Sequence, residues 1–486
     1  MYKVYQKIIL ACLLLVMTGT VYSQRVTQTI NDGWKFSLFE GDASTADFDI
    51  SGWTDVSIPH TWNAKDADDE IPGYFRGKGW YRKVVTVEEL IPEQRVYLSF
   101  EGANQETNVF VNGTFVGNHK GGYSAFTFDV TDYVHAGRNL IAVSVDNSHH
   151  PDIAPLSADF TFFGGIYRDV YLVYTSPVQL STTHYASSGV YLKASKITDL
   201  QANISVKTFL SNALKSNQSL ILETEILDAD GNRVALSQKK VNVKAEEKNV
   251  AFESLMTITQ PKRWDVDSPY IYKVYSRLKN KKEEVLDCVV NPLGIREYRF
   301  DAEKGFFLNG KYRKLIGTSR HQDYKGMGNA LRDEMHIRDV QLSKDMGSNF
   351  LRVAHYPQDP VVMQMCDKLG LLTSVEIPVV NAITQSKAFM DNCVEQVTEM
   401  VYQNYNYPSV IIWAYMNEVL LRPPFNPENR TERADYMTFL HQIASAVEAQ
   451  IRSLDSERYT MLPCHSASQI YQEAGITELP LSLIHI

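Results

Sequence analysis

The chain has 486 residues, of which 44% are hydrophobic and 22% are charged. These values are ordinary for folded globular proteins and exclude a disordered chain, a collagen and a multi-span membrane protein. A single hydrophobic core stops growing near about 250–300 residues, so two or three domains are expected. The formal net charge of −9 argues against a nucleic-acid partner and against an anionic-membrane partner.

The first 23 residues have the pattern of a secretory signal. Lys3 and Lys7 precede an apolar run over residues 8–17, and small residues follow it up to Ser23. We expect cleavage after Ser23 and an exported protein, either periplasmic or secreted. A membrane anchor, the alternative, would need about 20 apolar residues. This run is shorter and no later segment is apolar enough, so no membrane span is expected.

Residues 24–175 predict a β-sandwich of the jelly-roll type. Strand-like runs occupy residues 95–100 and 140–145, and Asn112-Gly113 stands between two apolar arms. Asn-Gly in that setting is typical of a two-residue type I′ hairpin. Many short strands at close spacing predict a jelly roll or a related sandwich.

Residues 176–294 predict a second β domain, lysine-rich and of about the size of an immunoglobulin domain. Its segment Asp228-Ala-Asp-Gly-Asn232 resembles the start of a calcium loop. The acidic ligands that such a loop needs further along are missing, so we interpret it as a tight turn.

From residue 295 to residue 486, short apolar strands alternate with helical segments. This alternation predicts parallel βα units, in a doubly wound sheet or a (β/α)8 barrel. The predicted strands cover residues 314–319, 349–354, 371–376, 410–416 and 459–463, and the predicted helices cover residues 333–346, 360–369, 388–405 and 433–454. Reactive residues in such folds lie where the strands end.

Polar and ionisable residues follow four successive predicted strands. They are His321, His355, Glu376 and the pair Asn417-Glu418. Any one of them could be structural, the histidines packed in a core and the pair serving as a helix N-cap, but four in register indicate an active site. Glu418 is the sharpest candidate, because a carboxylic acid still protonated near neutral pH donates a proton to a departing sugar oxygen. Asn417 beside it could bind a substrate hydroxyl.

Four stretches of the chain together resemble glycoside hydrolase family 2, which includes β-galactosidases, β-glucuronidases and β-mannosidases. They read Asp-Phe-Thr-Phe-Phe-Gly-Gly-Ile-Tyr-Arg-Asp at 159–169, Gly-Thr-Ser-Arg-His-Gln-Asp at 317–323, Asn-Phe-Leu-Arg-Val-Ala-His-Tyr-Pro at 349–357 and Ile-Trp-Ala-Tyr-Met-Asn-Glu at 412–418. The resemblance covers essentially all of the chain after the signal. It implies a jelly-roll sugar-binding domain, an immunoglobulin-like domain and a (β/α)8 barrel, in that order.

The resemblance also implies roles for single residues. It implies that Glu418 is the general acid/base, that Asn417 contacts the sugar 2-hydroxyl, and that His321, His355 and Asp159 line the sugar subsite, with Asp159 reaching in from the jelly roll. A carbohydrate substrate is the implied partner, no cofactor is implied, and an oligomer is compatible with the sequence. The chain lacks the Glu-x-His that supplies magnesium ligands in some β-galactosidases, so no metal is expected at that site.

Members of this family retain anomeric configuration, so a second carboxylate must attack the sugar. In the family this nucleophile follows the seventh barrel strand. At about 30 residues per βα unit, the nucleophile is expected near position ~510. We therefore expect a C-terminally truncated barrel and an inactive chain, and we assign this role to none of Glu457, Glu473 and Glu478. Five strands can be counted, or six if residues 476–479 begin another. Residues 481–486 match one reading frame of a sequencing-library end and are a suspected artefact.

Together these features predict an exported retaining exo-β-glycosidase that hydrolyses terminal β-linked sugars. β-Galactosidase is the first expectation, ahead of β-glucuronidase and β-mannosidase. A non-catalytic carbohydrate-binding protein on the same fold is the alternative from another class. Asn417-Glu418 distinguishes the two, because a binding protein has no need of a carboxylic acid at that strand end.

Overall fold

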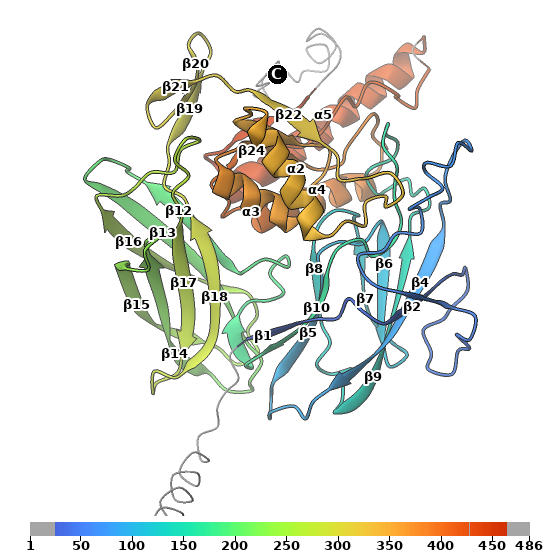
Figure 1. The fold of residues 1–486 in the computed structure, drawn as a ribbon, viewed down its shortest axis with the longest axis horizontal. Coiled ribbons are helices and arrows are strands. Elements are labelled where there is room, and N and C mark those ends of the chain that lie inside the picture. Colours follow the sequence, from blue (N-terminus) through green and yellow to red (C-terminus); the bar gives the residue numbers. More distant parts are fainter. Residues whose placement is uncertain (1–24, 427, 464–486) are drawn as a thin grey trace, which may run out of the picture.

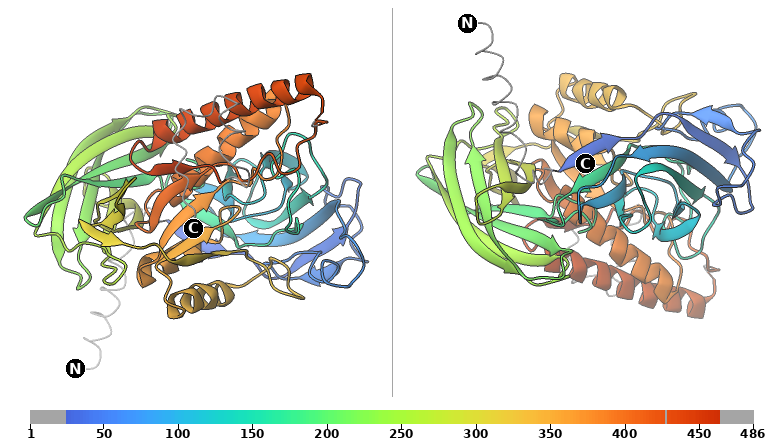
Figure 2. Two further views of the ribbon diagram at one scale, coloured as in Figure 1. Left: turned by 90° about the horizontal axis from the view of Figure 1, so that it is seen from above. Right: turned by 90° about the horizontal axis from the view of Figure 1, so that it is seen from below.

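The computed structural model describes residues 25–426 and 428–463. The predicted signal, the candidate strand at 476–479 and residues 481–486 lie outside the described residues, as do Glu473 and Glu478. Two β-sandwiches lie side by side, and a parallel sheet with its helices rests against both (Figure 1; Figure 2). Within the described ranges, no helix combines the length and the apolar composition needed to cross a membrane.

The first sandwich is the predicted jelly roll. Its four-stranded sheet has the order β1 (Val26–Thr29), β10 (Val170–Thr175), β5 (Arg95–Phe100) and β8 (Phe126–Asp129), and its six-stranded sheet has the order β3 (Thr54–Val56), β2 (Trp34–Leu38), β4 (Lys78–Val87), β9 (Gly137–Asp146), β6 (Glu106–Val111) and β7 (Thr114–Lys120). Leu98, Val109 and Val143 lie in the core between the sheets. Between β6 and β7, Asn112 and Gly113 both have positive φ, 50° and 82°, as a type I′ turn requires.

The second sandwich is immunoglobulin-like and also antiparallel. One sheet has the order β11 (Val178–Leu180), β13 (Gln201–Asn212) and β12 (Val190–Ser195), with β16 (Val250–Thr259) also on β13, and the other has the order β15 (Arg233–Val243), β14 (Gln218–Leu227), β17 (Tyr272–Lys279) and β18 (Val285–Leu293). The predicted tight turn joins β14 to β15. There the Asp228 carboxylate accepts hydrogen bonds from the backbone N–H groups of Asp230 at 3.0 Å and Asn232 at 2.8 Å.

The third part contains five parallel strands of a barrel. Their order is β22 (Gly317–Arg320), β23 (Phe350–Val353), β24 (Leu372–Glu376), β25 (Val410–Ala414) and β26 (Tyr459–Met461), and the intervening helices are α2 (Asp333–Asp345), α3 (Pro360–Leu369), α4 (Lys387–Asn404) and α5 (Arg430–Leu454). The helices cover one face of the sheet, where they pack on Leu351, Val375 and Trp413. Because strand side chains alternate, Arg352 and Glu376 point to the opposite, inner face. The predicted fold class is confirmed.

One element was not predicted from the sequence. A three-stranded antiparallel sheet, β19 (Tyr298–Asp301), β20 (Gly305–Leu308) and β21 (Lys311–Arg313), precedes the first barrel strand. Its Phe306 and Leu308 pack with Phe350 and Leu372 on the inner face of the parallel sheet. The predicted strand at 314–319 was therefore placed too early, because the backbone groups of residues 314 and 316 bond to the Asn349 side chain and the strand begins at Gly317.

Candidate functional site

The carboxyl ends of three neighbouring strands bring a polar network together on the inner face of the sheet. Arg352 of β23 is its centre: Nη2 donates to Asn417 Oδ1 at 2.9 Å, and Nε donates to Glu376 Oε1. His355 Nδ1 lies 3.1 Å from Glu376 Oε2. One guanidinium therefore links the ends of β23 and β24 to the segment after β25.

Glu376 is a buried carboxylate, with a side chain only 1% exposed. A buried charge is costly unless it is paired, and Arg352 and His355 engage its two oxygens. Sequence reasoning noted Glu376 at a strand end but gave neither it nor Arg352 a role. The available signal was a charged residue at an inward position of each of two otherwise uncharged strands.

Asn417 and Glu418 follow β25 in a tightly held backbone. Asn417 N–H donates to Val379 O at 2.8 Å, and Glu418 N–H donates to Pro463 O at 2.9 Å. Glu418 has φ 52°, a left-handed conformation that is uncommon and strained for a non-glycine residue and that clusters at functional sites. The N-cap alternative is wrong, because Asn429 caps the following helix α5. Glu418 Oε2 lies 3.5 Å from Asn417 Nδ2.

The two histidines face each other across the ends of β22 and β23, with ring centroids 5.5 Å apart. His321 is exposed and His355 is half-buried, so neither is a packed core histidine. His321 Nδ1 lies 3.1 Å from the Tyr356 hydroxyl. Partial burial and the neighbouring His355 lower the pKa of His321 below its usual 6.5, so its ring is neutral at neutral pH.

A loop of the jelly roll reaches these histidines. The Phe160 ring lies 5.2 Å from the His321 ring and 6.1 Å from the His355 ring, measured between centroids. Asp159 is exposed and makes no hydrogen bond or ion pair with the described residues, but its charge acts to raise the pKa of His321. Asp159 is thus brought near His321 without a hydrogen bond or an ion pair to it. Phe160, beside it, was missed by sequence reasoning.

Behind the network, four carboxylates gather between the jelly roll and the barrel: Glu101, Asp169, Asp333 and Asp359. The Tyr171 hydroxyl bridges Glu101 Oε1 at 3.2 Å and Asp169 Oδ2 at 3.0 Å. Burial, reinforced by the charges of Asp359 and Asp169, raises the pKa of Glu101 to about 8 and that of Asp333 to about 6. In the part of the chain that the structure describes, no three His, Cys, Asp or Glu side chains are grouped so as to hold a metal ion.

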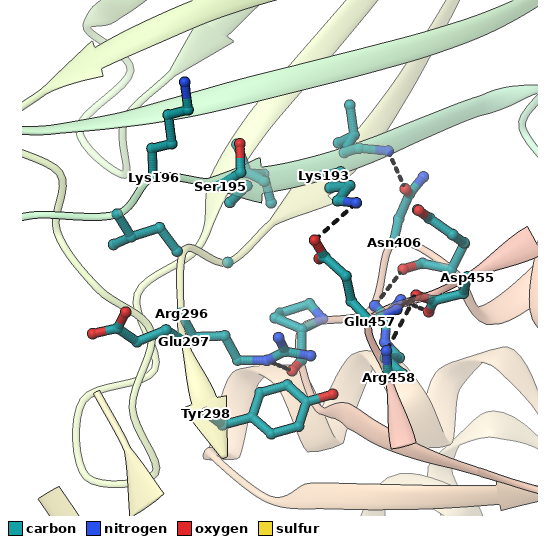
Figure 3. A pocket seen from close by; sticks show the side chains of 17 residues that line it. Lys193, Ser195, Lys196, Arg296, Glu297, Tyr298, Asn406, Asp455, Glu457 and Arg458 are labelled. Atoms are coloured by element: carbon teal, nitrogen blue, oxygen red, sulfur yellow. Dashed lines mark hydrogen bonds and ion pairs between the residues drawn. The ribbon is translucent and has the colours of Figure 1, made fainter. Parts of the chain in front are cut away.

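A well-formed cavity of about 330 Å³ lies elsewhere, between the immunoglobulin-like domain and the amino-terminal ends of the strands (Figure 3). Its charged groups largely pair with one another: Lys193 Nζ lies 2.8 Å from Glu457 Oε1, and Arg458 Nη1 lies 2.6 Å from Asp455 Oδ2. Asn406 bonds the backbone of β12 across it. We interpret this region as a domain junction.

Three family models match the chain in the order of its domains. "Glycosyl hydrolases family 2, sugar binding domain" matches residues 27–177, "Glycosyl hydrolases family 2" matches residues 188–296, and "Glycosyl hydrolases family 2, TIM barrel domain" matches residues 301–478.

Curated relatives and solved structures agree with these models. A β-glucuronidase of Bacteroides fragilis is 36% identical over 84% of this chain and 58% of its own length. A β-galactosidase of Thermoanaerobacter pseudethanolicus is 34% identical over 81% of this chain and 51% of its own length. The structure of Bacteroides uniformis β-glucuronidase 2, covalently bound to cyclophellitol-6-carboxylate aziridine, is 39% identical with a TM-score of 0.89, over 93% of this chain and 54% of that one. Another structure of that enzyme is a calcium-binding mutant with two aspartates changed to alanine. The chain spans about half the length of the curated relatives it matches.

Proposed function

Because the chain belongs to glycoside hydrolase family 2, we propose that its gene product is a retaining exo-β-glycosidase with Glu418 as general acid/base. The observation that carries the proposal is the position of Glu418. It stands at a strand end in a strained backbone, beside Asn417 and the network of Arg352, Glu376 and His355. A non-catalytic sugar-binding protein gains nothing from a strained carboxylic acid at this place.

In the proposed reaction, Glu418 first protonates the departing glycosidic oxygen and then, as a carboxylate, takes a proton from the attacking water. A second carboxylate about 5–5.5 Å away forms the glycosyl intermediate. Glu376 does not suit that role, because both its oxygens are engaged and its side chain is buried. We propose that the nucleophile belongs to a barrel unit that follows the described strands.

The surrounding residues suit a sugar. With its Oδ1 held by Arg352, the Asn417 amide presents its Nδ2 donor toward the space beside Glu418. The neutral ring of His321 and the ring of His355 offer nitrogen atoms to sugar hydroxyls. Phe160 supplies an apolar wall between the two domains. We propose that Asp159 binds a hydroxyl from the jelly-roll side, because its carboxylate is exposed and unpaired within the described residues.

We propose β-glucuronides as the substrate class, with β-galactosides second. The sequence alone favoured β-galactosidase, but β-glucuronidases from Bacteroides fragilis and Bacteroides uniformis, at 36% and 39% identity, favour the alternative. The test is the kcat/KM of the full gene product on nitrophenyl β-glucuronide, β-galactoside and β-mannoside. At least tenfold preference for the glucuronide is expected, since one lost ion pair or charged hydrogen bond is worth about 1.4 kcal/mol or more. Preference for the galactoside would restore the first expectation, and no hydrolysis of any would favour a binding protein.

We also propose a calcium site at the four carboxylates between the jelly roll and the barrel. Asp333 and Asp359 have the same spacing along the chain as the two aspartates changed in the calcium-binding mutant of the Bacteroides uniformis enzyme. Calcium prefers oxygen-rich clusters. Burial, together with mutual repulsion of the carboxylates, raises the pKa of Glu101 and Asp333, and a bound cation would relieve the repulsion. The carboxylates would have to close around the ion.

Calorimetric titration of the EDTA-treated chain with calcium chloride tests this site. We expect one ion per chain and a higher unfolding temperature, both lost in Asp333→Asn/Asp359→Asn. Asp228→Asn, in the tight turn between β14 and β15, is the matched control and should bind as the wild type does. Equal calcium binding by wild type and the double variant would refute the site.

Finally, we propose export to the periplasm or beyond the cell, on the basis of the amino-terminal pattern. Sequencing the amino terminus of the mature protein should then find Gln24 first. A retained Met1 would refute the proposed cleavage after Ser23.

A further inference from the structure

Arg168 lies at the seam between the jelly roll and the barrel loops, and it is only 3% exposed. The backbone approaches this seam through Gly165, which has φ 126° and no room for a side chain. A Cβ there would lie 2.6 Å from both His60 O and the Tyr81 hydroxyl. The segment that carries Arg168 is thus held closely against the jelly-roll core.

One guanidinium joins the two domains. Arg168 Nη1 donates to two jelly-roll carbonyls, Tyr123 O at 3.0 Å and Glu101 O at 3.3 Å. Its Nη2 donates to two groups of the barrel, Gln322 Oε1 at 3.1 Å and Pro357 O at 2.8 Å. The planar fork of arginine suits this arrangement, whereas the single ammonium of lysine cannot serve both sides in the same geometry.

The two barrel groups lie in the loops that carry the candidate histidines. Gln322 follows His321 directly, and Pro357 lies two residues after His355. Tyr356, which lies between His355 and Pro357 in the chain, stacks on Tyr123 of the jelly roll with ring centroids 4.2 Å apart. The Tyr356 hydroxyl is also the partner of His321 Nδ1. Arg168 therefore acts on both histidine loops at once.

We propose that Arg168 is a positioning residue that holds the His321 and His355 loops against the jelly-roll loop of Asp159 and Phe160. It shapes the sugar subsite without touching the sugar. The effect of Arg168 on catalysis rests on the proposed function, whereas its effect on the two histidine loops can be tested without any substrate.

The first test follows the His321 imidazole by NMR as pH is varied, in the full chain and in Arg168→Lys. Four groups act on this ring besides burial: His355, Asp323, Asp159 and Glu376. If the loops loosen, the partial burial and the close approach of His355 that lower the pKa of His321 are relieved, and this pKa rises toward the ordinary 6.5. Gln322→Leu, which removes one barrel contact, should produce a smaller rise.

Arg296→Lys is the matched control. Arg296, in the segment that joins the immunoglobulin-like domain to the barrel, also bonds two backbone carbonyls, Pro408 O and Val410 O, but at the opposite ends of the strands. It should lower the unfolding temperature as Arg168→Lys does while leaving His321 unchanged. The proposal is overturned if Arg168→Lys remains folded and its His321 titrates as in the wild type.

The second test measures binding of a glucuronic-acid lactone by calorimetry. Arg168→Lys should bind about tenfold more weakly, which corresponds to about 1.4 kcal/mol, and Arg296→Lys should bind as the wild type does. Unchanged affinity in Arg168→Lys would overturn the claim that Arg168 shapes the subsite. If the lactone does not bind the wild type, the proposed sugar is refuted and the His321 titration still decides the role of Arg168.

Discussion

Arg352 Nη2 donates a hydrogen bond to Asn417 Oδ1 at 2.9 Å, and this contact fixes which way the Asn417 amide faces. The oxygen is turned toward β23, so the amide donor is turned toward Glu418. The same guanidinium also compensates the buried charge of Glu376. Arg352 thus links the stability of the inner face of the barrel to the geometry of the proposed site.

Replacing Arg352 should destabilise the protein strongly. Arg352→Met leaves the Glu376 carboxylate, 1% exposed, without its main partner, and breaking a buried pair in this way costs about 3–5 kcal/mol. Urea unfolding measures the loss. The double variant Arg352→Met/Glu376→Gln should recover part of it, because no unpaired charge remains. If the double variant is less stable than Arg352→Met, burial of the charge is not the cause.

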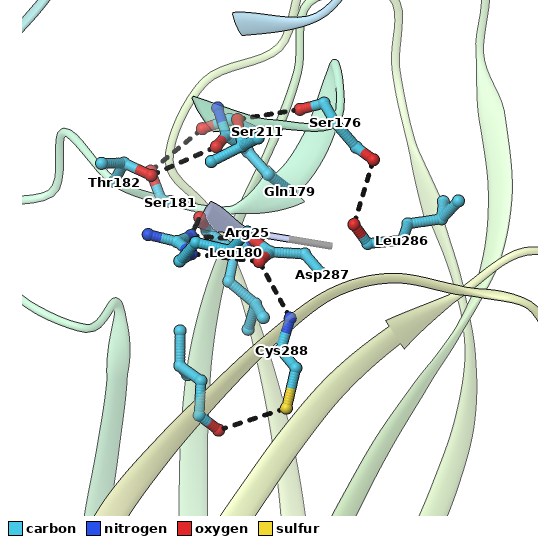
Figure 4. Close-up of polar contacts among 12 residues, drawn as sticks. Arg25, Ser176, Gln179, Leu180, Ser181, Thr182, Ser211, Leu286, Asp287 and Cys288 are labelled. Atoms are coloured by element: carbon cyan, nitrogen blue, oxygen red, sulfur yellow. Dashed lines mark hydrogen bonds and ion pairs between the residues drawn. The ribbon is translucent and has the colours of Figure 1, made fainter. Parts of the chain in front are cut away.

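The junction between the two sandwiches should depend on Arg25. Arg25 Nε and Nη2 bond the two oxygens of the fully buried Asp287 at 3.0 and 2.8 Å, and Asp287 also accepts from two backbone N–H groups (Figure 4). Arg25→Met should lower the free energy of unfolding by about 3 kcal/mol in urea titrations. Lys387→Met, which breaks an exposed pair with Asp391, should cost at most about 0.5 kcal/mol. Equal losses in the two variants would contradict this account of the junction.

Glu101 should make the protein less stable as pH rises. Burial and the nearby Asp359 and Asp169 raise the pKa of Glu101 to about 8, whereas the ordinary pKa of a glutamate in the unfolded chain is 4.5. Between these two pH values the folded state still holds a proton on Glu101 that the unfolded state has released. The stabilising effect of that proton is complete below pH 4.5 and is lost as pH rises toward 8. In EDTA, the urea midpoint of the wild type should therefore fall further between pH 5.5 and 8.5 than that of Glu101→Gln. Glu303→Gln, at an exposed position, is the control and should behave as the wild type does.

Several parts of this structure were accessible from sequence because local chemistry decides them. Residues 360–369 form the predicted helix, since Asp359 caps it, Pro360 begins it and Gly370 ends it at φ 70°. The strand ends that carry His321, His355 and Glu418 were likewise found from the alternation of strands and helices. Parallel strands place their carboxyl ends together, so these positions followed from the pattern.

Other features depend on contacts between distant segments. The Arg352–Glu376 pair and the reach of Arg168 across the seam join residues from different units, and no local pattern encodes such partners. The sheet β19–β21 was missed because its apolar residues cover the inner face of a sheet formed later in the chain. The four family stretches do not decide the sugar for a related reason: they hold features common to several activities, so relatives were needed to favour the glucuronide.

The most direct test of the account compares Glu418→Gln with the wild type, both as the full gene product, on two substrates of the same sugar. One has a nitrophenyl leaving group and the other an unactivated alkyl group. Removing a general acid should lower kcat/KM by about 10²–10⁴-fold on the alkyl glycoside. The loss of kcat/KM should be clearly smaller on the nitrophenyl glycoside, which needs little proton donation. Azide should restore turnover of the glycosyl intermediate, because it needs no general base. Equal losses on both substrates with no rescue by azide, or unchanged hydrolysis of the alkyl glycoside, would contradict the assignment of Glu418.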